Sequence, residues 1–110
     1  MYKRGEIVLV PVPFSNLTNT KKRPVLVVSN TAHNFGGSDM IVVAITSNIV
    51  QNGIVIETSD LTVGALPKKS LIRCDKIYTL EQSIAVKRFG VLSDDVLLKV
   101  ANEIHRLITE

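Results

Sequence analysis

The chain has 110 residues, of which 45% are hydrophobic and 21% charged, an ordinary composition for one small globular domain that excludes a disordered chain. Thirteen Lys and Arg against ten Asp and Glu give a net charge of +3, so an acidic partner such as nucleic acid is allowed but not required. The single cysteine, Cys74, excludes an internal disulfide framework. Because the sequence also has no signal-like start and no apolar run of membrane length, we expect a cytoplasmic protein without membrane contact.

Short apolar runs bounded by turn residues predict strands through most of the chain. Residues 7–12 and 25–28 are rich in β-branched side chains and flank a polar stretch at 15–23, so we expect a hairpin with a long loop. Pro24 favours an extended backbone at Arg23, at the entrance of the second strand. Further strands are predicted at residues 41–46, 53–57, 70–80 and 84–92.

The last segment changes to a helical period. Ser93 can cap a helix and Asp94 favours its first turn. Apolar residues then recur every three or four positions, at Val96, Leu97, Val100, Ala101, Ile104, Leu107 and Ile108, which predicts a packed amphipathic helix. Because the strands lack crossover helices, a doubly wound sheet is excluded. We predict one domain over residues 1–110, mainly β, in which a small bent antiparallel barrel packs against the C-terminal helix.

Several chemistries are not supported by the sequence. The segment from Phe35 to Ser38 contains two glycines but lacks the spacing and lysine of a phosphate-binding loop. The soft metal ligands His33, Cys74 and His105 are not spaced as a metal site requires. We therefore expect neither a metal nor another cofactor.

The most informative stretch contains Arg73 and Asp75. Side chains alternate along a strand, so these two emerge on one face about 7 Å apart, while Ile72 and Cys74 point to the other face. A guanidinium binds phosphate oxygens and a carboxylate can take a proton, a combination that suits phosphoryl transfer. An ordinary surface ion pair explains the same pattern.

Two other polar groups precede or end strands. Lys21, Lys22 and Arg23 form a cationic cluster, which is either a binding site for a polyanion or a solvated loop. Thr46 and Ser47 end the strand at 41–46 with hydroxyl groups, which also occur in ordinary turns.

Together these stretches resemble the MazF/PemK family of toxins from bacterial toxin–antitoxin systems. The matching blocks, in order, are residues 4–10, 22–29, 43–47 and 72–75, followed by residues 88–93 before the helix. The resemblance implies an SH3-like barrel that forms a homodimer and cuts single-stranded mRNA as a metal-independent, sequence-selective endoribonuclease. It also implies a cognate antitoxin protein that neutralises the toxin and binds DNA together with it.

The resemblance also suggests functional residues. By matching positions, it assigns catalysis to Arg23, Thr46, Arg73 and Asp75, and RNA binding to Lys21, Lys22, Ser47 and Lys76. The loop at residues 15–22 departs from the glycine- and glutamine-containing loop of many members. This difference leaves open which RNA sequence the protein cuts and whether it has full activity. Gyrase-poisoning relatives use an aromatic C-terminal tail, and this chain contains no Trp, which argues against that activity.

RNA cleavage without a metal requires proton removal from the 2′-hydroxyl, stabilisation of the phosphorane and protonation of the leaving 5′-oxygen. We hypothesise that Asp75 takes the 2′ proton or orients the arginine that assists it, while Arg73, Arg23 and Thr46 hold the phosphate. The products would be a 2′,3′-cyclic phosphate and a 5′-hydroxyl. The alternatives are a non-catalytic basic barrel that binds RNA or an antitoxin-like peptide, and a purely structural dimer.

Overall fold

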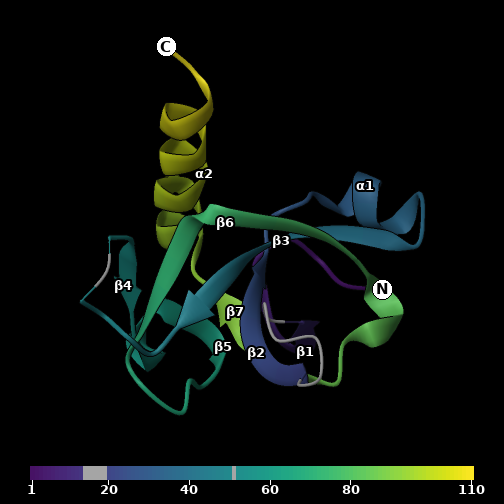
Figure 1. Cartoon of the computed structure of the whole chain (residues 1–110), viewed down its shortest axis with the longest axis horizontal. Coiled ribbons are helices and arrows are strands. Elements are labelled where there is room, and N and C mark those ends of the chain that lie inside the picture. Colours follow the sequence, from purple (N-terminus) through teal and green to yellow (C-terminus); the bar gives the residue numbers. More distant parts are fainter. Residues whose placement is uncertain (14–19, 51) are drawn as a thin grey trace.

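The computed structural model describes residues 1–13, 20–50 and 52–110. Its strands are β1 (Glu6–Pro13), β2 (Thr20–Val27), β3 (Asp39–Thr46), β4 (Ile54–Ile56), β5 (Leu61–Gly64), β6 (Ser70–Glu81) and β7 (Lys87–Leu92), and its helices are α1 (Thr31–Phe35) and α2 (Asp94–Ile108). Single 3₁₀ turns occupy Thr58–Asp60 and Gln82–Ile84. The prediction of a mainly β chain with a C-terminal helix is confirmed (Figure 1).

The strands form one curled antiparallel sheet in the order β4-β6-β3-β2-β1-β7-β5. The predicted hairpin is present, since β1 and β2 pair from Ile7 opposite Leu26 to Pro13 opposite Thr20. The second strand therefore begins at Thr20, and the prediction of a loop extending to residue 23 was wrong. Lys21 and Lys22 lie on β2 because their backbones pair with β1. The remainder of the predicted loop, residues 15–19, lies outside the described residues.

Two short elements were not predicted. Helix α1 has five residues and is capped by Asn30, whose side chain accepts a hydrogen bond from the His33 N–H. Strand β5 has four residues and approaches β7 closely at Gly64 and Gly90, where a Cβ on Gly90 would lie 2.1 Å from the Val63 carbonyl oxygen. Both elements are too short for a periodic apolar pattern to reveal them.

Each face of the sheet carries an apolar cluster. On one face, inward side chains of β1, β2, β3 and β6 pack with the buried side of α2; this cluster includes Ile7, Leu26, Val43, Ile45, Ile72, Cys74, Val96, Leu97 and Val100. The other face is filled by Val8, Val10, Val25, Val27, Met40 and Val42 with partly buried residues beside them. In the described part of the chain, no helix combines the length and apolar character that a membrane crossing requires.

Strand β6 contains a large bulge that shapes the site described below. Ile77 pairs with Val43, whereas Arg73 pairs with the next residue of β3, Ala44. Residues 74–76 therefore have no partner on β3, and a bulge of this kind bends a strand. Figure 1 shows β6 bending beside α2, and the two elements are in contact.

Candidate active site

Arg73 and Asp75 form a two-bond ion pair on the bulged part of β6. Arg73 donates from Nε to Asp75 Oδ1 and from Nη2 to Oδ2, both at 3.0 Å. The Arg73 side chain is 20% exposed and the Asp75 side chain 50% exposed. Cys74, between them, is buried in the core below. The expected alternation is therefore present, and the long Arg73 side chain closes the gap to the carboxylate.

The ion pair fixes the protonation of both groups. The hydrogen bonds from Arg73 hold the pKa of the Asp75 carboxyl below its usual range, with a smaller contribution from Lys76, and Asp75 raises the pKa of Arg73 in return. At neutral pH the pair is therefore fully ionised, and Asp75 is a weak base. Of the five N–H donors of a guanidinium, Asp75 engages two, which leaves three that can reach another anion.

Arg23, Thr46 and Arg73 lie on one face of three neighbouring strands. Ala44 of β3 pairs with Val25 of β2 on one side and with Arg73 of β6 on the other. Side chains two residues apart share a face, so Arg23 shares the face of Val25, and Thr46 that of Ala44. All three predicted residues are half-buried. Adjacent strands lie about 4.8 Å apart, so β2 and β6 are close enough for one ligand to span them.

The hydroxyl groups at the end of β3 take part in a turn. Thr46 Oγ1 accepts a hydrogen bond from the Asn48 N–H at 3.1 Å, which confirms a turn at this point and leaves the Thr46 O–H able to donate. Ser47 is exposed and lines a small hollow of about 160 Å³ together with Arg23.

This hollow adds two residues that the sequence interpretation missed. Lys68 and Phe89 line it with Arg23 and Ser47, and the Lys87 ammonium lies 5.3 Å from the Phe89 ring centre. A cation and an aromatic ring beside an arginine have the chemistry that suits a stacked base and its backbone. In the sequence, the only feature that could have indicated this hollow is the pair of lysines, Lys68 and Lys69, that follows Pro67.

The predicted lysines are all exposed but differ in position. Lys21 and Lys22 precede Arg23 on β2, with Lys21 on the same face as Arg23 by alternation. Lys76 lies in the bulge of β6 beside Asp75. The structure therefore places two of these cations on β2 and the third two strands away.

Asp75 faces a different hollow from Arg23. It lines a space of about 160 Å³ between the β6 bulge and α2, together with Asn52, Gly53, Cys74, Glu103, Arg106 and Leu107. The Cys74 thiol is buried, and burial raises its pKa to about 11. Within residues 1–13, 20–50 and 52–110, no three His, Cys, Asp or Glu side chains group as a metal site would need.

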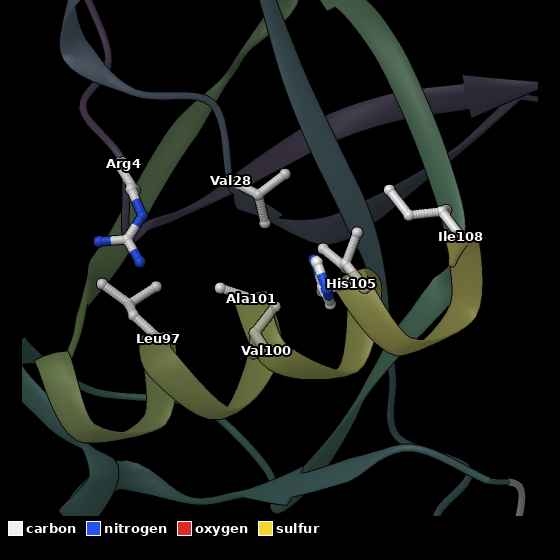
Figure 2. A pocket seen from close by; sticks show the side chains of 8 residues that line it. Arg4, Val28, Leu97, Val100, Ala101, His105 and Ile108 are labelled. Atoms are coloured by element: carbon white, nitrogen blue, oxygen red, sulfur yellow. The ribbon is translucent and has the colours of Figure 1, made fainter. Parts of the chain in front are cut away.

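A second and more apolar hollow adjoins α2 (Figure 2). Its volume is about 340 Å³. It is lined by Arg4, Val28, Leu97, Val100, Ala101, Ile104, His105 and Ile108, a set we call the α2 groove. Only part of the predicted apolar stripe of α2 is buried, because Leu107 is 43% and Ile108 71% exposed. None of the predicted catalytic or RNA-binding residues lines the α2 groove.

Comparison with known proteins agrees with this architecture. Residues 3–108 match the family model of the PemK-like, MazF-like toxins of type II toxin–antitoxin systems. No curated protein matches the chain.

Several solved structures share the fold at low sequence identity. A MazE–MazF complex from Deinococcus radiodurans is similar, with 21% identity, a TM-score of 0.74 and coverage of 97% of this chain and 95% of that one. A mycobacterial endoribonuclease in complex with its cognate antitoxin has 17% identity, a TM-score of 0.70 and coverage of 96% and 93%. The toxin MazF-mt6 from Mycobacterium tuberculosis has 18% identity, a TM-score of 0.68 and coverage of 90% and 93%. At these identities the likeness concerns the fold.

Proposed function

The chain belongs to the PemK-like, MazF-like toxins of type II toxin–antitoxin systems, and we propose that it is a metal-independent, sequence-selective endoribonuclease acting on single-stranded mRNA in the cytoplasm. The observation that carries this proposal is the two-bond Arg73–Asp75 pair on a rigid strand, on the face that Arg23 and Thr46 share. Two solved relatives of the same fold are described as endoribonucleases from mycobacterial species.

The proposed reaction is an internal phosphoryl transfer. The 2′-hydroxyl of the substrate gives its proton to water or to Asp75, the 2′-oxygen attacks phosphorus, the P–O5′ bond breaks, and the leaving 5′-oxygen takes a proton from water. The products are a 2′,3′-cyclic phosphate and a 5′-hydroxyl. The negative charge on the phosphate oxygens grows as the phosphorane forms, so fixed donors aimed at these oxygens lower the barrier. Arg73, with three N–H donors not used by Asp75, and Arg23 supply the positive charge, and the Thr46 hydroxyl supplies a hydrogen bond.

Asp75 has two alternative roles in this scheme. It can take the 2′ proton, or it can hold the Arg73 guanidinium in the plane and direction that the phosphate requires. Its lowered pKa makes it a weak base, and both of its oxygens already accept hydrogen bonds from Arg73. We therefore propose that Asp75 acts as a positioning residue. Lys21, Lys22, Ser47 and Lys76 are exposed and are proposed to contact the RNA on either side of the cut.

Cleavage of a labelled single-stranded RNA, followed by analysis of the ends, tests the reaction. We expect cyclic phosphate and 5′-hydroxyl ends, unchanged rates in EDTA, and large losses in Arg73→Ala and Asp75→Ala. If both variants stayed within about threefold of wild type, the assignment would be wrong. RNA binding without any cleavage would instead favour the alternative, a non-catalytic basic barrel that binds RNA or an antitoxin-like peptide.

A cognate antitoxin is the proposed protein partner. Relatives of the same fold have been solved in complexes described as MazE–MazF and as an endoribonuclease with its cognate antitoxin. Induction of the chain in a bacterium should arrest growth, and co-expression of the product of the neighbouring gene should restore it. The purified complex, but not the toxin alone, should bind DNA of the operon's promoter. Growth that continues despite soluble expression would contradict the toxin assignment.

We also propose a homodimer, with the α2 groove occupied by the end of α2 from a second copy. The groove is apolar and carries the cationic Arg4, whereas the last turn of α2 offers exposed Leu107 and Ile108, with Glu110 two residues beyond the helix. Apolar surface and charge are therefore complementary, and a two-fold axis would make the exchange reciprocal.

Light scattering tests this dimer. Ala101→Glu puts a carboxylate inside the groove and should produce monomers. The matched control, Asn102→Glu, changes an exposed neighbour that does not line the groove and should remain dimeric. Wild-type monomers at micromolar concentration, or a dimeric Ala101→Glu variant, would refute this interface.

A further inference from the structure

The hollow between the β6 bulge and α2, which we call the α2–β6 hollow, is lined by members of two arginine–carboxylate pairs. One is Arg73–Asp75, and the other is Arg106–Glu103, in which Arg106 donates from Nε to Oε1 at 2.6 Å and from Nη2 to Oε2 at 3.1 Å. Asp75, Glu103 and Arg106 line the hollow, whose volume is about 160 Å³. Asp75 thus contacts Arg73 on one side and the hollow on the other.

The charged residues that line the α2–β6 hollow include more carboxylates than guanidinium groups, which distinguishes the hollow from a phosphate site. The carboxylates of Asp75 and Glu103 line it with one guanidinium, that of Arg106, so there is no excess positive charge to hold an anion. The polar groups instead include acceptors, on Asp75 and Glu103, and donors, on Arg106 and the Asn52 amide. This mixture matches the edge of a nucleobase, which also carries donors and acceptors side by side.

The remaining walls of the hollow are uncharged. The Cys74 thiol is neutral at physiological pH because burial raises its pKa to about 11, and Leu107 adds apolar surface. Gly53 packs so closely on β6 that a Cβ would lie 2.4 Å from the Ile72 carbonyl oxygen, so no side chain can enter the hollow from this position. A flat, neutral ligand is therefore accommodated better than an anionic one.

We propose that the α2–β6 hollow binds one unpaired base of the RNA, next to the phosphate held by Arg73. This inference rests on the proposed function and adds a source of sequence selectivity to it. The carboxylates of Asp75 and Glu103 accept hydrogen bonds from exocyclic amino groups, which adenine, cytosine and guanine have and uracil lacks. The base in the hollow is accordingly one with an amino group, and uracil is disfavoured.

Binding of free nucleosides tests the hollow independently of catalysis. Adenosine, cytidine, guanosine and uridine carry no phosphate, and each can be titrated into the wild-type protein while backbone amide resonances are recorded by NMR. The expected dissociation constant is weak, about 1 mM. The expected result is a set of shifts at Gly53, Cys74 and Leu107 for at least one amino-bearing nucleoside, and weaker shifts for uridine. Shifts of equal size for uridine, or none at these residues, would overturn the proposal.

Cut-site profiling on a randomised RNA provides the second test. Glu103→Gln removes an acceptor charge and its ion pair with Arg106, and should reduce discrimination against uracil about fivefold or more at a single position near the cut. The matched control, Glu81→Gln, makes the same change six residues beyond Asp75 on β6, about 20 Å away along the strand, and should leave the profile unchanged. An unchanged profile in Glu103→Gln would also overturn the proposal. A protein that binds amino-bearing nucleosides in the hollow yet cuts no RNA would contradict the proposed nuclease function and support the base site.

Discussion

The substitution Asp75→Asn separates the two roles that Asp75 can have in RNA cleavage. Asparagine has nearly the shape of aspartate but carries one acceptor oxygen and no charge. It can therefore keep one of the two hydrogen bonds from Arg73, which now measure 3.0 Å each, and loses the other. If Asp75 positions Arg73, this change should lower the cleavage rate moderately. If Asp75 is the general base, the change should remove nearly all of its contribution to the rate.

The expected magnitude follows from the geometry. A hydrogen bond to a charged group contributes about 1.5–3 kcal/mol. Because the Asp75 side chain is 50% exposed, water replaces part of the lost bond, and we expect a loss of about 1 kcal/mol, which corresponds to a rate about fivefold lower. Removal of a general base costs about 100-fold to 10,000-fold. The two roles therefore predict results that differ by more than an order of magnitude.

Single-turnover cleavage of a labelled RNA, measured between about pH 5 and pH 8, is the appropriate assay. Because Arg73 lowers the pKa of Asp75, the carboxylate stays ionised throughout this range, above the ordinary carboxyl pKa of about 3.9. Loss of the ionised form would begin only below that value, so the wild-type profile should show no step from Asp75. A loss beyond about 100-fold in Asp75→Asn would refute the positioning role, and an unchanged rate would remove Asp75 from the site.

Three further predictions concern the scaffold. The Cys74 thiol, with a pKa raised to about 11 by burial, should react with iodoacetamide at pH 7.5 at least about tenfold more slowly in the folded than in the unfolded protein; equal rates would contradict its burial. Ser93→Ala removes the side-chain oxygen that caps the Val96 N–H of α2 and should lower the free energy of unfolding in urea by about 1 kcal/mol, whereas no change would show that the cap is not used. Gly90→Ala would place a Cβ 2.1 Å from the Val63 carbonyl oxygen and should lower the free energy of unfolding by at least about 2 kcal/mol. The control Gly37→Ala, with nothing within 4 Å of its Cβ, should leave the free energy of unfolding nearly unchanged. Equal effects of the two substitutions would refute the close approach of β5 and β7.

Strong local patterns explain why much of the fold was predictable from the sequence. The β-branched runs of β1, β3 and β6 and the apolar period of α2 are long enough to identify their elements. The start of β2 was missed because Lys21 and Lys22 are polar, and their place in the strand depends on pairing with β1. No local pattern encodes such a partner. The end of α2 was expected to pack like its beginning, but Ile108 extends beyond the sheet and stays 71% exposed.

The candidate site was predictable in its residue types and only partly in its arrangement. Alternation correctly put Arg73 on the face opposite Cys74, and the resemblance to a toxin family supplied Arg23 and Thr46. The separation of Asp75 and Arg23 into different hollows could not be foreseen, because it depends on a bulge in β6. Lys68 and Phe89 were missed because they meet Arg23 only through the tertiary fold. Whether these residues catalyse RNA cleavage stays a prediction.

The bulge in β6 gives a common ion pair the features that a catalytic site needs. In a regular ladder, residues 74–76 would each face a residue of β3, and Asp75 would be one more outward carboxylate beside a cross-strand neighbour. The bulge instead leaves these three residues unpaired between Ala44 and Val43, so Asp75 can accept both hydrogen bonds from Arg73 while still reaching the α2–β6 hollow. One irregularity thus brings together a guanidinium, the carboxylate that orients it and the hollow beside them. In the proposed function, Asp75 would then serve both the phosphate contact, through Arg73, and base selection, through the hollow.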